Sequence, residues 1–159
     1  MVRRCGWWIG MAAAALFLAS GLAVAGSGLY PGWEKGGAYD SLYRVSEYDS
    51  FKGEVVKIVE ITPMPGMAPG AGLVVNDGDE NILVHLGPVG FVDPKATGFK
   101  PGDRVKVKGV WADIRGEEIF LASKVKKGDL YQLKVRRTRD GLAFWEMSAE
   151  ELEEERAEE

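Results

Sequence analysis

Hydrophobic and charged residues alternate most clearly along Arg104–Lys108, where valines take every second position. This period of two predicts a strand with one buried face and one solvated face. The preceding Lys100–Asp103 contains the proline and glycine of a tight turn, and Gly109 breaks the alternation, which predicts a β-bulge. A polar turn over residues 114–118 then leads to a second apolar run at residues 119–125. The pattern therefore predicts a strongly curved hairpin.

Other β-rich segments predict the remaining strands. They cover residues 51–62, 73–76 and 81–86 before this hairpin, and residues 130–136 and 142–147 after it. A long loop follows the first strand and a crossover joins the third to the fourth, as in an OB-fold barrel. The predicted fold class is all-β, a five-stranded OB-fold-like barrel with an extra C-terminal β-hairpin. Seven side chains are expected to point into this barrel: Ile82, Val84, Leu86, Val105, Val107, Ile119 and Leu121.

The segments on either side of the barrel domain (residues 51–147) differ in character. Residues 1–25 combine a basic start, an apolar run and a small-residue end, which predict a signal peptide, with a retained membrane anchor as the alternative. Residues 26–50 form an irregular N-terminal arm, whose aromatic residues favour packing on the barrel over a partner-binding role. Residues 148–159 form an acidic C-terminal tail, in which Ser148 and Glu151 predict a capping box, although like charges weaken the helix.

Charge is spread unevenly along the chain. The formal net charge is −4, yet residues 100–139 carry 12 Lys and Arg against 5 Asp and Glu, and residues 140–159 carry 9 acidic residues and one basic residue. A basic segment in an acidic chain is a candidate anion-binding surface, which the acidic tail can also screen. The single cysteine, Cys5, lies in the predicted signal peptide. The exported chain would therefore lack thiolate zinc sites, iron–sulfur clusters and covalently attached haem.

The loop over residues 63–72 suggests a soft-metal site. Met64, Met67 and the single histidine, His85, offer two thioethers and one imidazole, which suit Cu(I). The alternative is that the methionines fill gaps over the barrel mouth. On either view we expect the loop to border the binding surface, with His85 on a nearby outward face, because OB barrels commonly grip ligands with this loop.

Basic residues of the later strands suggest a second surface. Alternating Lys and Arg residues beside aromatic rings suit single-stranded nucleic acid. The same alternation is also typical of a solvated strand face, and the net acidity and predicted export argue against nucleic acid. The basic residues are Arg104, Lys106, Lys108, Lys124, Lys126, Lys134 and Arg136, and the aromatic residues are Trp111, Phe120 and Tyr131.

Catalytic and calcium sites find little support in the sequence. Asp77, Asp79 and Glu80 surround Gly78, but the further ligands that a calcium loop needs at fixed spacing are absent, so a hairpin turn is favoured. A single histidine with no supporting motif gives no Ser-His-Asp arrangement. We therefore expect a non-enzymatic protein and assign it no cofactor, with copper and iron as the metals to consider.

Four motifs together resemble a family of small exported bacterial OB-like proteins. They are Thr62-Pro63-Met64-Pro65-Gly66-Met67, Val84-His85-Leu86-Gly87-Pro88, Lys100-Pro101-Gly102-Asp103-Arg104-Val105 and Gly141–Trp145. The family includes the domain shared by the magnetosome proteins MamS and MamX, and the resemblance covers Phe51–Trp145. It implies a role in the periplasm or at an invaginated membrane, connected with iron handling. The chain lacks a Cys-x-x-Cys-His haem motif, so a role that depends on this motif does not carry over.

The chain is also similar, more distantly, to the OB-fold of the periplasmic haem chaperone, but it has no counterpart of that protein's C-terminal His and Tyr region. Together these patterns predict a periplasmic or secreted binding or assembly module, with a protein or small ligand as its partner. Membrane contact is expected only through an uncleaved N-terminal segment. The residues predicted to contact the partner are Met64, Met67, His85, Trp111 and Tyr131.

Overall fold

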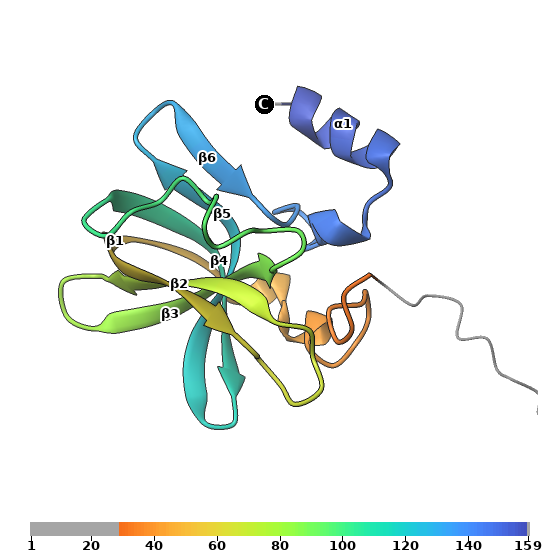
Figure 1. Cartoon of the computed structure of the whole chain (residues 1–159), viewed down its shortest axis with the longest axis horizontal. Coiled ribbons are helices and arrows are strands. Elements are labelled where there is room, and N and C mark those ends of the chain that lie inside the picture. The colour runs from red at the N-terminus through yellow and green to blue at the C-terminus, as the bar shows by residue number, and fades with distance from the viewer. Residues whose placement is uncertain (1–28, 159) are drawn as a thin grey trace, which may run out of the picture.

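A computed structural model describes residues 29–158, so the predicted signal peptide at residues 1–25 lies outside the described residues. Within this range the chain is mostly β-structure with a few short helices (Figure 1). The strands are β1 Tyr48–Ile61, β2 Gly70–Asn76, β3 Asn81–Pro88, β4 Arg104–Ile114, β5 Glu117–Lys127 and β6 Tyr131–Lys134. The helices are the 3-10 turns η1 Asp40–Leu42, η2 Val45–Glu47 and η3 Phe144–Glu146, and the α-helix α1 Ala149–Ala157. None of the helices in residues 29–158 combines the length and apolar character that a membrane span requires.

The strands form one sheet in the order β3-β2-β1-β4-β5-β6. β3 also pairs in parallel with β5, at Val84 with Phe120 and at His85 with Leu121, and this pairing closes the sheet. The first five strands therefore make the predicted OB-like barrel, and β6 extends it beyond β5. The long strand β1 pairs with β4 along its first half and with β2 along its second half.

The predicted irregularity at Gly109 is confirmed, but the extra residue belongs to β5. Lys108 pairs with Lys124 and Gly109 with Ala122, which leaves Ser123 as the additional residue. A Cβ atom on Gly109 would lie 2.0 Å from the carbonyl oxygen of Leu121, so the close approach of β5 requires glycine there. One extra residue reverses the alternation of side chains along a strand. Every second residue of β5 therefore faces one side of the sheet before Ser123 and the opposite side after it.

This reversal changes the predicted core. Val105 and Val107 lie in the barrel core, as expected, together with the predicted residues Ile82, Val84 and Leu86 of β3. Ile119 and Leu121 are buried in a second cluster on the outer side of β5, so placing them in the barrel was wrong. Before Ser123 the inward positions of β5 belong instead to Phe120 and Ala122, and after it to Val125.

The second cluster is covered by the N-terminal arm. Trp33, Tyr39 and Tyr43 are buried against Val110, Ala112, Ile119 and Leu121, which confirms that the arm's aromatic residues pack on the barrel. The indole N–H of Trp33 donates to the carbonyl oxygen of Ala68 at 2.8 Å, and this bond ties the arm to the loop after β1. The arm therefore shields the outer surface of β4 after Gly109, and of β5 before Ser123, from solvent.

The C-terminal segment contains less β-strand than predicted. β6 pairs with β5, but the returning segment makes a single bridge, between Arg136 and Ala143, before η3 begins. Ser148 and Glu151 form the predicted capping box at the start of α1. Glu155 on this helix accepts hydrogen bonds from Arg137 at 3.2 Å and Arg139 at 3.1 Å, so the acidic tail is held against the segment that follows β6.

Candidate binding surface

Lysine side chains form two rows across the outer surface of the barrel. The backbone register places Lys52 of β1 opposite Lys106 of β4, and Lys106 opposite Lys126 of β5. One step along, the register aligns Lys108 of β4, Lys124 of β5 and Lys134 of β6. We call these six residues, together with Arg104, the basic face.

The alternation of β4 explains why these lysines share a face. Val105 and Val107 are buried in the core, so Lys106 and Lys108 between them point outward. On the other side of the bulge the outward positions are Val110 and Ala112, which the arm covers. The outer surface of β4 therefore changes at Gly109 from a basic, open half to an apolar, covered half.

The arrangement is electrostatically unfavourable in the isolated protein. Like charges directly opposite each other on neighbouring strands destabilise a sheet. Lys52, Lys106 and Lys126 make no ion pair with any residue in 29–158, and the same is true of Arg104 and Lys108. These five cations therefore stay without an ion pair among residues 29–158.

A hollow of about 600 Å³ lies at one end of the basic face. It is lined by Lys52, Arg104, Lys106 and Lys126 from the strands, by Gly78 of the β2–β3 turn and by Gly128 of the β5–β6 turn. Figure 1 shows these two turns on the side of the barrel away from the N-terminal arm. The hollow is therefore independent of the surface that the arm covers.

Three carboxylates also line the hollow: Glu54, Asp77 and Asp129. Glu54 is the register partner of Arg104 across β1 and β4. Asp77 accepts backbone N–H bonds from Asp79 at 2.8 Å and Glu80 at 2.9 Å inside its own turn, and these bonds lower the pKa of Asp77. This confirms the hairpin reading of the acidic turn, and it shows that Asp77 has its hydrogen-bond partners within its own turn.

Most residues of the basic face were predicted from the sequence, and one was missed. The lysines proposed for nucleic acid, Lys106, Lys108, Lys124 and Lys134, are brought together as expected. Lys52 was missed, although its place between the partly buried Phe51 and Gly53 was a signal of an outward side chain. Arg136 was wrongly included, because only 2% of this residue is exposed.

Arg136 instead joins the arm to the C-terminal segment. Its Nη1 atom donates to Asp40 Oδ1 at 2.7 Å and to the carbonyl oxygen of Gly141 at 3.0 Å. Its guanidinium lies 5.0 Å from the ring centroid of Tyr43 and 4.9 Å from that of Trp145. The buried Arg136 side chain thus holds the arm and the C-terminal segment together, and it is not available to a partner.

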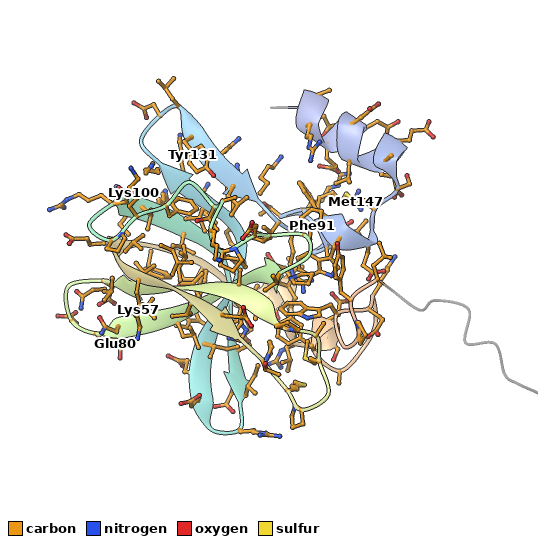
Figure 2. The ribbon with its side chains drawn as sticks, viewed as in Figure 1. Lys57, Glu80, Phe91, Lys100, Tyr131 and Met147 are labelled. Carbon is orange, nitrogen blue, oxygen red and sulfur yellow. The ribbon has the colours of Figure 1, made fainter. Side chains whose placement is uncertain are left out.

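Trp111 and Tyr131 lie on the inner side of their strands, not beside the lysines. Trp111 is partly buried against Phe51 and Phe120, and its indole N–H donates to Asp49 Oδ2 at 3.0 Å. Tyr131, labelled in Figure 2 at the start of β6, packs on Phe99 and donates its hydroxyl hydrogen to the carbonyl oxygen of Thr97. The expectation that both rings flank the basic residues is wrong, because alternate positions of a strand face opposite sides.

His85 lies on the strand face that points away from the barrel core, as expected, but the arm covers this face, so His85 is not at the surface. Only 4% of the residue is exposed, and its Nδ1 atom is 2.9 Å from the hydroxyl oxygen of Tyr39. Burial lowers the pKa of His85 to about 4 and raises the pKa of Tyr39 above its ordinary value of 10.0. Both groups are therefore neutral at neutral pH. His85 also lines a small hollow of about 160 Å³ with Thr62, Pro63 and Glu117.

The two methionines of the loop pack against the arm's cluster. Ala68 donates its backbone N–H to the carbonyl oxygen of Pro31 at 2.7 Å, so the loop is tied to the arm. A Cβ atom on Gly32 would lie 2.3 Å from Met67 Cγ, which shows how closely Met67 packs on that glycine. Among residues 29–158, no group of three or more His, Cys, Asp and Glu side chains is placed to hold a metal ion. Coordination by Met64, Met67 and His85 stays a prediction.

Comparison with known proteins gives one family match. Residues 47–131 match the MamS/MamX magnetosome protein family, a region that runs from η2 through the five barrel strands to the first residue of β6. The matched region spans more than half of the 159 residues and contains most of the basic face. A search of curated proteins gives no match.

Proposed function

Because the chain belongs to the MamS/MamX magnetosome protein family, we propose that it is an exported, non-enzymatic binding or assembly module that acts at the magnetosome. Its contact surface is the basic face, and its partner presents acidic groups. The family match supports the association with the magnetosome, and the basic start and apolar run of residues 1–25 support export.

One observation carries the binding role, namely the two rows of lysines. A sheet gains nothing in stability from lysines placed opposite lysines, whereas a surface that binds anions gains directly from them. Natural proteins break such local rules mainly at functional sites. The part of the outer surface that the arm leaves open is the part that carries these charges.

Asp49, Asp103 and Asp140 have structural partners that lower their pKa values, and we assign these carboxylates no catalytic role. Hydrogen bonds from Arg137 lower the pKa of Asp140 to about 2, and the Trp111 indole lowers the pKa of Asp49. The backbone N–H of Lys100 lowers the pKa of Asp103 in the turn before β4. Catalytic acids and bases usually have pKa values tuned towards neutral pH, which is the opposite direction for a carboxylate.

A charge-reversal experiment tests this function. Full-length protein is expressed in a magnetosome-forming bacterium as the wild type, as Lys106→Glu/Lys108→Glu, or as the control Lys57→Glu/Lys95→Glu. Both double variants change the charge equally, and Lys57 and Lys95 are exposed residues outside the basic face (Figure 2 labels Lys57). We expect only the basic-face variant to be lost from the purified magnetosome fraction. Equal retention of both variants would show that the basic face does not bind there.

A soft-metal function using Met64, Met67 and His85 is the alternative, and one observation favours it. His85 lines a hollow of about 160 Å³ together with Pro63, the residue that precedes Met64 in the sequence. Imidazole and thioether ligands suit copper. If this function holds, Cu(I) raises the melting temperature of the wild type and not that of Met64→Leu/Met67→Leu/His85→Asn. Nucleic-acid binding, the other alternative, is tested by the salt dependence of oligonucleotide affinity.

A further inference from the structure

We propose that the hollow at the end of the basic face is a binding subsite for a compact multivalent oxyanion, of the polycarboxylate or phosphate class. The inference rests on the proposed function in that the hollow is part of the same basic face. The inference adds a small ligand to the acidic partner of the proposed function. This small ligand binds Lys52, Arg104, Lys106 and Lys126. The larger acidic partner binds Lys108, Lys124 and Lys134.

The positions of the four cations support this assignment. They come from three neighbouring strands, with Lys52 on β1, Arg104 and Lys106 on β4, and Lys126 on β5. None of the four makes an ion pair within residues 29–158. The guanidinium of Arg104 offers two parallel N–H donors, the geometry that suits carboxylate and phosphate, and the lysines add point charges. A multivalent anion in the hollow would relieve the repulsion within the first row.

The size of the hollow fits a small ligand. Its volume of about 600 Å³ lies within the usual range for small-molecule sites, roughly 300–1,000 Å³. Gly78 and Gly128 also line it, and a Cβ atom on either would meet nothing within 4 Å, so a ligand can approach the backbone of both turns closely. The site is therefore more than a patch of surface charge, because residues of two turns line it together with the strands.

The carboxylates of the turns argue against a long polyanion. Asp77 lies in the β2–β3 turn and Asp129 in the β5–β6 turn, on either side of the strands that carry the cations. A nucleic-acid strand crossing the hollow would bring phosphates near these carboxylates, whereas a compact anion can remain over the lysines and Arg104. This geometry favours a ligand that is small and carries several charges.

Isothermal titration of the full-length protein at constant ionic strength tests the subsite. The probes are citrate, ferric citrate and pyrophosphate, with acetate as the monovalent control. The hollow variant is Lys52→Gln/Lys106→Gln/Lys126→Gln, and the matched control is Lys108→Gln/Lys124→Gln/Lys134→Gln, which removes the same charge from the other row. Melting temperatures verify that both variants fold, and backbone amide NMR shifts at Gly53, Gly78 and Gly128 locate the bound anion.

We expect one or more multivalent anions to bind the wild type, the hollow variant to lose at least about tenfold in affinity, and the control to stay within about threefold. The relative strengths of citrate, ferric citrate and pyrophosphate identify the ligand class. Equal losses in both triple variants, acetate binding as tight as citrate, or no binding by any probe would overturn the subsite. None of these results affects retention in the magnetosome fraction, so the subsite and the proposed function can fail separately.

Discussion

Two buried polar residues fix how the arm lies on the barrel. Arg136 bonds Asp40 on η1, and His85 bonds Tyr39 just before η1, so the arm is joined both to the segment after β6 and to β3. A buried guanidinium needs hydrogen-bonding partners, and a buried imidazole is more stable when neutral. These two residues are therefore structural supports that keep the arm away from the basic face.

The neutral state of His85 predicts a pH dependence of stability. Its pKa is about 4 in the folded protein against 6.5 in the unfolded chain, so the unfolded chain binds more protons between these values. The His85 contribution is complete above pH 6.5 and is lost as the pH falls towards 4. From pH 7 to pH 4 the free energy of unfolding of the wild type should fall by about 3 kcal/mol more than that of His85→Asn, which does not titrate.

Urea unfolding at the two pH values measures this difference. Asn is a suitable replacement because its amide can still hydrogen-bond to the Tyr39 hydroxyl. The same pH dependence in both proteins would mean that His85 is accessible to protons in the folded state, contrary to its buried position under the arm.

Residue positions could be predicted from the sequence only where the cause is local. Val105, Val107 and Lys106 were placed correctly because the period of two in β4 decides their faces. Arg136 and His85 also lie in β-like segments, but their burial comes from an arm that is distant in the sequence. A pattern within one strand contains no information about such a cover.

At the scale of elements, the pairing of β1, β4, β5 and β6 creates the basic face. No single strand contains a row, and Lys52 joins one only through the register of β1 with β4. The extra residue Ser123 then decides where the basic half of β5 ends and the apolar half begins. Ser123 could not be predicted as the bulge residue from the sequence, because residues 119–125 contain no glycine or proline that would mark an irregularity in the strand.

The like-charged row predicts that one substitution raises stability. Lys106→Glu places a carboxylate between Lys52 and Lys126 and replaces two unfavourable cross-strand pairs with favourable ones. The free energy of unfolding should rise by about 0.2–1 kcal/mol for each pair. The gain should shrink in high salt, which screens surface charges.

Denaturant unfolding at low and high salt checks this prediction, with Lys57→Glu as the control of equal charge change. Lys57 has Val74 as its register partner on β2, so its substitution should change stability little. Loss of stability in Lys106→Glu would show that the lysine supports the fold, which would contradict a purely functional role for the row.

On the scale of the whole molecule, the arm and the open basic face occupy different parts of the barrel's outer surface. The arm covers the outer side of β4 and β5 beyond the bulge and also buries His85 of β3. The β2–β3 and β5–β6 turns, whose residues line the hollow, lie on the other side of the barrel (Figure 1). The β class, the strand order and the packing of the arm followed from the sequence. The position of the open surface did not, because it depends on what the arm leaves uncovered.

Lysine footprinting on isolated magnetosomes tests the central claim, that the basic face is the binding surface. Free and magnetosome-bound wild-type protein are acetylated under matched conditions, and mass spectrometry compares the reactivity of each lysine. We predict that binding protects Lys52, Lys106, Lys108 and Lys126 and leaves Lys57 and Lys95 as reactive as in the free protein. Protection of Lys57 and Lys95, with Lys106 and Lys108 unchanged, would contradict the account.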